Sequence, residues 1–424
     1  MRNPPHPVSP ILERTREAAR GWKDTIIIQR LRVIARARRL IAAEASTLAA
    51  SVGVQRPIAD TLAAEVLPLA EAARFVERQA ARLLAPRRLG RRGRPAWLAG
   101  VAAEIRREPC GVVLILAPAN YPLFLPGVQI LQALAAGNGV CAKPASGCAA
   151  PLAAFADLLL RVGLPSDLLA ILDDSVEMGQ AASRAAFDRI VLTGSAETGI
   201  SVLRAAAEQI TPCTMELSGD DPVFVLAGAD LRLAAVAIAY GVRLNDGNTC
   251  IAPRRVFAEA AVYAELERLL TPMEKLVPLT PVRDPDEALA LAARSPYALG
   301  AAVFGPEKAA CALAARINAG SVVVNDVIVP TADPRLSFGG RRRSGFGVTR
   351  GAEGLLEMTV VKTVSIRRGR FRPHLDPASG QDRALLTALI AALHGNVRTR
   401  LAALPALLRA TRGLRPSSSR CSRG

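Results

Sequence analysis

The stretch Gly111-Val112-Val113-Leu114-Ile115-Leu116-Ala117-Pro118-Ala119-Asn120-Tyr121-Pro122 decides the fold that this sequence predicts. Its first six residues form a continuous apolar run, which is typical of a strand buried on both faces of a sheet. The prolines that follow end the strand, and residues 127–136 continue as an apolar segment of helical length. A buried strand followed by a turn and a helix is the repeating unit of a parallel α/β sheet.

The same alternation extends along the chain in both directions. Apolar residues recur at three- and four-residue spacing across residues 11–84, which predicts helices. After the opening stretch we expect strands at 139–143, 168–172 and 189–192, and helices at 151–162 and 201–207. A second α/β unit begins near Pro222, with helices at 231–244, 286–293 and 307–317, strands at 255–257, 301–304 and 321–325, and a final strand at 359–366.

Composition limits the classes of protein that fit the chain. It has 424 residues, of which half are hydrophobic, so it can form two or three globular domains with large cores. The formal net charge is +17, which admits a nucleic acid or an anionic membrane as a partner. Over the body of the chain the basic residues are scattered rather than clustered, as compositional bias would give. We therefore expect no specific nucleic-acid partner.

The sequence also indicates a compartment. The first seven residues, Met1 to Pro7, contain no apolar signal core, and the longest uncharged stretch, 109–142, is repeatedly broken by Pro, Asn and Gly. Seven cysteines form no CxxC pair and only three histidines are present, so no metal site is expected. Scattered unpaired thiols suit a reducing compartment, and we expect a cytoplasmic protein without a transmembrane helix.

Three short motifs carry groups that together can perform acyl chemistry. Cys250 lies in Asn245-Asp246-Gly247-Asn248-Thr249-Cys250, Glu216 precedes Leu217-Ser218-Gly219, and Asn120 lies in the turn of the opening stretch. A thiol can attack a carbonyl carbon, a carboxamide can stabilise the resulting oxyanion, and a carboxylate can activate water against a thioester. Each group also has a structural reading: a core cysteine, a surface glutamate at a strand end, and a turn asparagine.

In this order the three motifs resemble those of the aldehyde dehydrogenase superfamily. The resemblance implies that Cys250 is the nucleophile, Glu216 the general base, and Asn120, with the Cys250 backbone N–H, the oxyanion hole. The chain departs from the usual family residues at three places, where Asn248 replaces Gln, Ala119 replaces Trp and Ser218 replaces Gly. The implied reaction is the oxidation of an aldehyde to a carboxylic acid through a cysteine thiohemiacetal and thioester.

The resemblance also implies a nicotinamide cofactor, NAD or NADP. Lys143 matches a lysine that contacts the adenosine ribose, and Ser146 stands where a glutamate usually repels a 2′-phosphate. The segment from Thr193 to Gly199 resembles a T-G-S-x-x-x-G turn, in which Gly194, Ser195 and Gly199 would let backbone N–H groups approach a pyrophosphate. Glu274 partly matches a glutamate that holds the nicotinamide ribose. A glycine-rich loop at 336–347 also matches the family pattern.

The fold class implied is α/β, with a Rossmann-like cofactor domain, a truncated α/β catalytic domain and a small oligomerisation hairpin. The expected division is 1–90 for N-terminal helices of the cofactor domain, 91–108 for the hairpin and 109–221 for the NAD(P)-binding domain. It continues with 222–335 for the catalytic domain, 336–366 for the glycine loop and final strand, and 367–424 for a basic helical or disordered tail. The hairpin makes a homo-dimer or homo-oligomer the expected assembly.

One segment is shorter than the family pattern. Glu274 follows Cys250 after only twenty-four positions, so part of the usual catalytic scaffold is missing. A catalytically impaired homologue that acts as a binding or interaction protein is therefore an alternative, because catalysis requires accurate placement of its groups. Two further alternatives remain. One is the reduction of an acyl phosphate or acyl-CoA, although such a reductase would not need Glu216 as a base. The other is the binding of an anionic surface through the arginines.

The C-terminal tail, residues 367–424, also has more than one interpretation. Residues 385–408 form an amphipathic stretch rich in Ala, Leu and Arg. It could lie on a membrane surface with arginines on one face, or dock on the body of the protein or on a neighbouring subunit.

Overall fold

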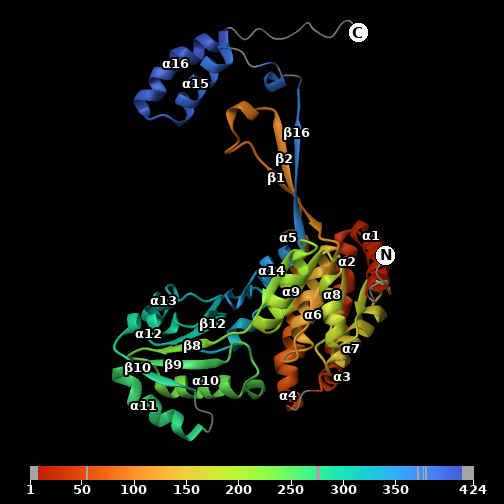
Figure 1. Cartoon of the computed structure of the whole chain (residues 1–424), viewed down its shortest axis with the longest axis vertical. Coiled ribbons are helices and arrows are strands. Elements are labelled where there is room, and N and C mark those ends of the chain that lie inside the picture. The colour runs from red at the N-terminus through yellow and green to blue at the C-terminus, as the bar shows by residue number, and fades with distance from the viewer. Residues whose placement is uncertain are drawn as a thin grey trace. The chain divides into compact units, whose positions relative to one another are not determined.

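The computed structural model describes residues 8–53, 56–273, 277–369, 372–375, 377 and 380–412. The chain separates into two compact units (Figure 1). Unit 1 comprises Met1–Leu89 and Ala103–Val364, and unit 2 comprises Gly90–Ala102 and Ser365–Gly424. Unit 1 contains both large sheets and every described residue that the sequence assigned to the site.

The first large sheet of unit 1 is a six-stranded, mostly parallel sheet. Its spatial order is β15-β7-β6-β3-β4-β5, and only β15 runs antiparallel, to β7. The opening stretch forms the central strand, which is completely buried, as its apolar run predicted. The strands are β3 (Val112–Leu116), β4 (Gly139–Lys143), β5 (Leu169–Ile171), β6 (Arg189–Thr193), β7 (Cys213–Glu216) and β15 (Gly345–Phe346).

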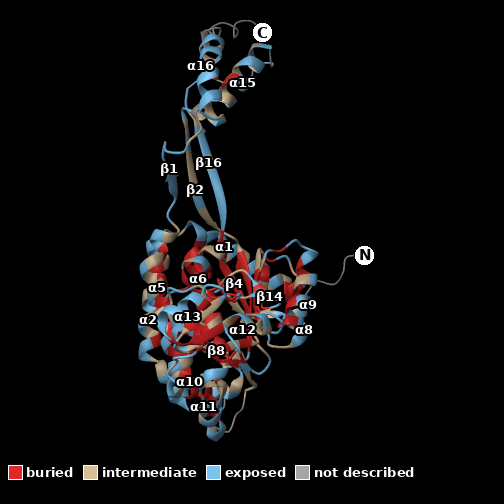
Figure 2. Ribbon diagram, turned by 90° about the vertical axis from the view of Figure 1, so that its left-hand side faces the viewer, coloured by how far each residue is buried: buried red, intermediate tan, exposed pale blue. Residues whose placement is uncertain are grey.

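Helices cover this sheet and form the largest hydrophobic core with it (Figure 2). The predicted N-terminal helices are present as α1 (Ser9–Asp24), α2 (Ile27–Ala43), α3 (Ala45–Ser51), α4 (Ile58–Thr61), the π-helical turn η1 (Leu62–Val66) and α5 (Leu67–Leu83). The crossover helices are α6 (Phe124–Ala136), α7 (Ala149–Arg161), α8 (Val176–Arg184) and α9 (Ala196–Ala207), and α14 (Gly351–Glu357) follows later in the chain. The order of strands and helices confirms the predicted Rossmann-like α/β class.

The second large sheet is entirely parallel. Its order is β10-β9-β8-β12-β13, so the predicted truncated catalytic domain still forms a five-stranded sheet. Two hydrophobic clusters cover its two faces. The strands are β8 (Asp221–Val225), β9 (Pro253–Glu259), β10 (Leu279–Val282), β12 (Gly300–Phe304) and β13 (Ser321–Val324), and the helices are α10 (Leu231–Arg243), α11 (Ala260–Leu270), α12 (Pro285–Ala292) and α13 (Glu307–Ala314).

A three-stranded sheet contains the region where the sequence placed a hairpin. Strand β2 (Val101–Pro109) lies between β1 (Arg87–Leu89), with which it pairs antiparallel, and β16 (Thr359–Arg367). The sequence placed the hairpin at 91–108; in the structure its first strand is β1, and Ala96–Leu98 forms a 3-10 turn, η2, between the two strands. A small two-stranded sheet, β11 (Tyr297–Ala298) with β14 (Arg341–Arg342), supports the glycine loop.

Unit 2 contains a helical hairpin where the sequence predicted one amphipathic stretch. Helices α15 (Gly380–His394) and α16 (Val397–Arg412) are separated by Gly395 and Asn396, after the short turn η6 (Pro373–Leu375). The Asn396 side chain accepts a hydrogen bond of 2.9 Å from the backbone N–H of Thr399, which caps the start of α16. Among the described helices, none is both long enough and apolar enough to cross a membrane.

Candidate active site

The carboxyl ends of four neighbouring strands bring together the residues that the sequence singled out. Asn120 follows β3, Lys143 ends β4, Gly194 follows β6 and Glu216 ends β7. These strands are parallel and adjacent, so their carboxyl ends lie on one edge of the sheet. This edge, beside the central strand where the strand order reverses, is where open α/β sheets bind their ligands.

The second sheet brings Cys250 to this edge. Glu216 ends β7 and Asp221 begins β8, so four residues, 217–220, join the two sheets. Cys250 lies just before the start of β9, the neighbour of β8. A Cβ added to Gly219, in the link, would come within 2.4 Å of the Cys250 carbonyl oxygen and 2.6 Å of Asp221 Oδ1. The link and the cysteine loop are therefore packed directly against one another.

The loop before Cys250 has an unusual backbone. Asn245, Asp246 and Gly247 all have positive φ angles, of 54°, 52° and 77°. Asn, Asp and Gly are the residue types that tolerate this left-handed conformation best, which explains their presence in the motif. The Asn245 side chain donates a hydrogen bond of 2.9 Å to the Asn120 carbonyl oxygen, so the loop is tied to the turn after β3.

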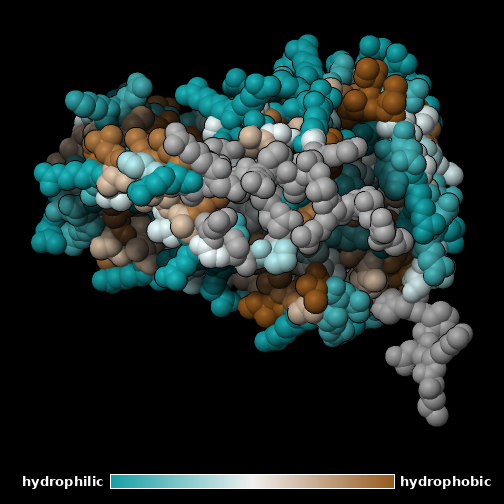
Figure 3. Space-filling model, turned by 90° about the horizontal axis from the view of Figure 1, so that it is seen from above, coloured by the Kyte–Doolittle hydropathy of each residue, from teal (hydrophilic) through white to brown (hydrophobic). Residues whose placement is uncertain are grey.

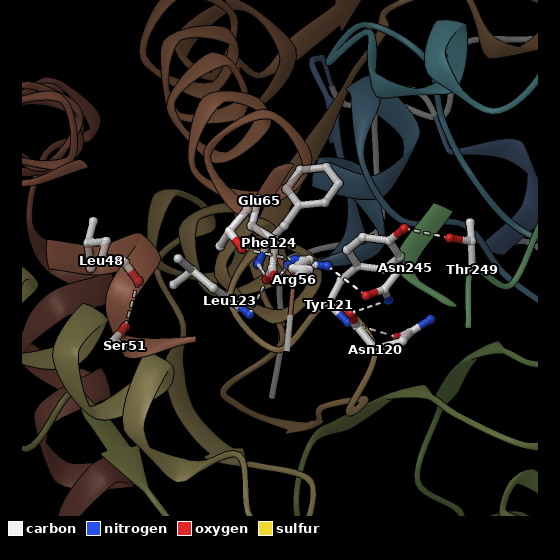
Figure 4. Close-up of polar contacts among 11 residues, drawn as sticks. Leu48, Ser51, Arg56, Glu65, Asn120, Tyr121, Leu123, Phe124, Asn245 and Thr249 are labelled. Carbon is white, nitrogen blue, oxygen red and sulfur yellow. Dashed lines mark hydrogen bonds and ion pairs between the residues drawn. The ribbon is translucent and has the colours of Figure 1, made fainter. Parts of the chain in front are cut away.

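Two further contacts connect the Asn120 turn with the Cys250 loop, and Figure 4 shows the one between Tyr121 and Thr249. Asn120 Nδ2 donates a hydrogen bond of 2.8 Å to the Asn248 carbonyl oxygen, and its Oδ1 accepts one of 3.0 Å from the Tyr121 backbone N–H. The hydroxyl groups of Tyr121 and Thr249 lie 2.6 Å apart, within hydrogen-bonding distance. A carboxamide has two N–H groups, so one hydrogen of Asn120 remains to stabilise an oxyanion.

A buried ion pair supports the other side of the Asn245 side chain. The Arg56 guanidinium donates a 2.9 Å hydrogen bond to Asn245 Oδ1 and also pairs with Glu65, whose side chain is fully buried. The second Glu65 oxygen accepts the backbone N–H groups of Leu123 and Phe124, at 2.8 and 3.0 Å, at the start of α6. A carboxylate at a helix N-terminus satisfies otherwise unpaired donors. Figure 4 shows this chain of contacts.

The Cys250 thiol is held in its protonated form. Burial, together with the Asp221 and Glu216 carboxylates, raises the pKa of Cys250 to about 12, and Arg350 opposes them. The link that follows Glu216 packs against the Cys250 loop, which brings the candidate base close to the candidate nucleophile. A thiol with this pKa is a weak nucleophile at rest, because the thiolate is the reactive form.

Glu216 is enclosed between two threonines. Thr193 Oγ1 donates a hydrogen bond of 3.1 Å to Glu216 Oε2, and Thr349 Oγ1 donates one to Oε1. Burial raises the pKa of Glu216, while Thr349, Arg350 and Thr193 lower it. A carboxyl group whose pKa is raised by burial suits a general base.

Arg350 and Asp221 are two ionisable groups of the site that the sequence did not indicate. Arg350 is buried, has a φ of 57°, stacks on Phe338 and Phe124 at 4.4 and 5.8 Å, and donates to the Thr331 carbonyl oxygen. Asp221 is also buried, and its Oδ1 has no hydrogen-bond partner among the described residues. Burial raises the pKa of Asp221 to about 7.

The glycine loop at 336–347 fixes the strand that carries Glu216. The Ser344 carbonyl accepts the Leu217 N–H at 3.0 Å, and Ser344 Oγ donates to the Ser218 carbonyl oxygen at 2.7 Å. A Cβ added to Gly345 would meet the Met215 carbonyl oxygen at 1.9 Å, so only glycine fits there. The glycine density of the loop thus serves close packing beside the presumed base.

The expected cofactor residues lie at the same sheet edge, with two qualifications. Lys143 Nζ and Ser146 Oγ both donate to the Asp174 carbonyl oxygen, at 2.9 and 3.0 Å. Ser195 caps α9 by accepting the Thr198 N–H at 3.1 Å, just after Gly194. A Cβ added to Gly199 would meet Leu217 at 2.7 Å, so this glycine serves helix packing. Glu274 lies outside the described residues.

Comparison with known proteins agrees with this fold. The family model described as the aldehyde dehydrogenase family matches residues 5–277 and 274–364, and the two stretches meet where the sequence predicted a shortened segment. The chain therefore belongs to the aldehyde dehydrogenase family. This confirms the family that the sequence motifs predicted.

Individual relatives show how much of the chain is shared. The probable coniferyl aldehyde dehydrogenase of Pseudomonas aeruginosa is 30% identical over 380 residues, which cover 72% of this chain and 79% of that protein. The 4,4'-diapolycopene aldehyde oxidase of a Methylomonas species is 26% identical, and the match covers 85% of this chain and 82% of that protein. The crystal structure of an NAD-dependent aldehyde dehydrogenase from Sinorhizobium meliloti superposes with a TM-score of 0.81 over 87% of this chain and 88% of that one; at 24% identity it confirms the fold.

Proposed function

We propose that this protein oxidises an aldehyde to a carboxylic acid with NAD or NADP as the hydride acceptor. The observation that carries the proposal is the meeting of Asn120, Glu216 and Cys250 at the junction of the two sheets. Asn120 is bonded to the Cys250 loop, and the Glu216 charge acts on the Cys250 thiol. Membership of the family makes an oxidoreductase acting on aldehydes the expected class.

In the proposed reaction Cys250 Sγ attacks the carbonyl carbon, and Glu216 accepts the thiol proton and passes it to solvent. The free N–H of Asn120, with the Cys250 backbone N–H, stabilises the oxyanion of the thiohemiacetal. The bound nicotinamide supplies the hydride acceptor, and a thioester on Cys250 remains. Glu216 then removes a proton from a water molecule that hydrolyses the thioester and releases the acid.

The residues at the carboxyl edge of the first sheet fit a dinucleotide. Lys143 can hold a ribose hydroxyl, and the N-terminus of α9 after Gly194 and Ser195 offers backbone N–H groups to a pyrophosphate. Ser146 carries no charge against a 2′-phosphate. However, Asp174, Asp173 and Glu177 all act electrostatically on Lys143. Their negative charge favours NAD over NADP.

A catalytically impaired homologue is the second candidate, and one observation favours it. The resting thiol of Cys250 has a pKa of about 12, so the site needs a bound aldehyde or cofactor to make it reactive. A chain that lacks part of the catalytic scaffold could bind the dinucleotide and never complete this activation.

Formation of NADH or NADPH with a panel of aldehydes tests the proposal. We expect turnover that Cys250→Ser and Glu216→Gln abolish, with Glu216→Gln accumulating an acyl-enzyme detectable by mass spectrometry. The matched control is Cys311→Ser, because Cys311 is an exposed thiol on α13, and it should retain activity. Cofactor binding by calorimetry without turnover on any aldehyde would establish the impaired homologue instead.

A further inference from the structure

The helical hairpin of unit 2 carries a face of large apolar side chains that no described residue covers. Leu386 and Ile390 on α15, and Val397, Leu401 and Leu404 on α16, are between 47% and 73% exposed. In Figure 3, hydrophobic side chains in brown lie among hydrophilic ones in teal on the face seen from above. Such a contiguous set of exposed leucine-sized residues marks an interaction surface.

The packing of the two helices explains why this face is left open. The buried apolar residues of the pair are the small ones, Ala388 on α15 and Ala403 on α16. At about 100° per residue, Leu386 and Ile390 lie on the side of α15 opposite Ala388. Besides these alanines, Leu385, Leu389, Leu393 and Leu407 are half-buried. The pair thus covers some of its large side chains and leaves a further row of them exposed, which a self-sufficient helical pair would not do.

The charge of this part of the chain identifies its partner. Residues 365–424 contain twelve arginines and two aspartates, with no lysine or glutamate, so they carry +10 of the chain's net +17. On α16, Arg398 and Arg400 flank the apolar stripe on its two sides at helical spacing. An apolar stripe bordered by arginines matches a helix that lies in the interface of an anionic membrane.

The dimensions and the charge exclude two other arrangements. Helices of 15 and 16 residues are about 24 Å long at most, shorter than the roughly 30 Å hydrocarbon core, so they lie on a bilayer rather than cross it. Pairing with the same hairpin of a second copy would bring two strongly positive segments together, and their repulsion opposes that contact.

We propose that the α15–α16 hairpin is a docking surface for anionic lipid membranes. Its apolar stripe would enter the boundary between headgroups and acyl chains, and its arginines would bind lipid phosphate and carboxylate groups. The inference does not depend on the proposed catalytic function, since it rests on unit 2 alone. It would place an aldehyde-oxidising unit next to a source of aldehydes that partition into lipid.

Vesicle co-sedimentation of the full-length protein tests this proposal. The probes are vesicles of phosphatidylcholine and phosphatidylserine in about a 2:1 ratio and vesicles of phosphatidylcholine alone. We expect binding to the anionic vesicles that falls at high salt, and at least about tenfold weaker binding to the neutral ones. Ile390→Glu/Leu401→Glu, one change per helix, and Arg398→Gln/Arg400→Gln should each lower binding by about tenfold.

Matched controls separate the hairpin from general surface effects. Val236→Glu replaces an equally exposed apolar residue on α10, and Arg232→Gln/Arg268→Gln removes two exposed arginines from unit 1; both should bind vesicles as the wild type does. Circular dichroism and thermal unfolding establish that each variant folds.

Three results would overturn the proposal. Vesicle binding that survives the Glu substitutions would show that the apolar stripe is not engaged. Binding to duplex DNA as strong as to anionic vesicles would make the tail a nucleic-acid contact, if Arg398→Gln/Arg400→Gln abolished it and Ile390→Glu/Leu401→Glu did not. A dimer in solution that the Glu substitutions dissociate, together with no vesicle binding, would make a second copy the occupant of this face.

Discussion

Arg56 donates a hydrogen bond of 2.9 Å to the side chain of Asn245, 189 positions further along the chain. Arg56 also pairs with the fully buried Glu65, and Asn245 belongs to the left-handed segment before Cys250. The segment between α3 and α4 is therefore tied to the loop of the proposed nucleophile, and we predict that Arg56 positions it.

Replacing Arg56 with lysine should impair turnover more than folding. Lysine keeps the positive charge beside Glu65 but cannot reproduce the planar set of donors that reaches Glu65, Thr61 and Asn245 together. We expect kcat to fall by about tenfold with little change in KM, because a slightly displaced nucleophile slows the chemical step. The control is Arg38→Lys, since Arg38 pairs with Glu77 on the N-terminal helices. Equal losses in both variants would refute the positioning role.

Gly219→Ala should displace the Cys250 loop. Its new Cβ would lie 2.4 Å from the backbone oxygen of Cys250, which cannot yield as a flexible side chain could. We expect at least a hundredfold loss of kcat/KM, roughly 3 kcal/mol of transition-state stabilisation. The comparison is Gly21→Ala in α1, where nothing lies within 4 Å; it should be slightly stabilising and fully active. An active Gly219→Ala enzyme would mean that the link and the loop are not packed as described.

The pH dependence of alkylation reports on the thiol of Cys250. Because its pKa is about 12, its rate of reaction with iodoacetamide should still rise above pH 10, where a thiol of ordinary pKa has levelled off. Asp221→Asn removes a negative charge that disfavours the thiolate, so alkylation at pH 8 should become faster. Peptide mass spectrometry distinguishes Cys250 from the exposed Cys311. A plateau below pH 8 would contradict the burial of the thiol.

Asp221 makes stability depend on pH in a defined direction. Its pKa is 3.8 in a model peptide and about 7 in the folded protein. Between pH 3.8 and pH 7 the folded state therefore keeps a proton on Asp221 that the unfolded state has lost. The contribution of Asp221 to stability is therefore full below pH 4 and is lost as the pH rises toward 7, by at most about 4 kcal/mol. Asp221→Asn should gain stability relative to the wild type between pH 5 and pH 8, as measured by urea unfolding. A difference that is constant with pH would rule out the raised pKa.

The carboxylates around Lys143 should set the choice of cofactor. NAD should give the higher kcat/KM, and Glu177→Gln should raise kcat/KM for NADP by about threefold, because it removes one negative charge near the site of a 2′-phosphate. Glu208→Gln, at the far end of α9, should leave the NAD to NADP ratio unchanged. A wild-type preference for NADP would show that the neutral Ser146 outweighs the acidic cluster.

The sequence predicted the parts of the fold that local patterns determine. Buried strands such as residues 112–116 are apolar throughout. Asn120, Lys143, Gly194 and Glu216 lie at or just after the carboxyl ends of strands, where parallel sheets bind ligands. The contacts of Arg56, Thr349 and Asp221 were not predictable, because they connect segments far apart in the chain or depend on burial.

Two details of the structure have local causes that the sequence analysis did not use. The amphipathic stretch of the tail is divided at Gly395-Asn396, and glycine after one helix and asparagine before the next are ordinary end signals. The strand at Arg87–Leu89, before the predicted hairpin at 91–108, is exposed and arginine-rich, without the apolar alternation by which strands are identified.

The four-residue link between Glu216 and Asp221 has a consequence for how activity arises during folding. The presumed base and oxyanion donor belong to one sheet and the nucleophile to the other, so neither half can perform the reaction alone. The chain passes from one half to the other at the reaction centre itself. A small rotation of one half about this four-residue link would therefore move Glu216 away from Cys250. Activity is therefore a sensitive measure of whether the two halves have docked.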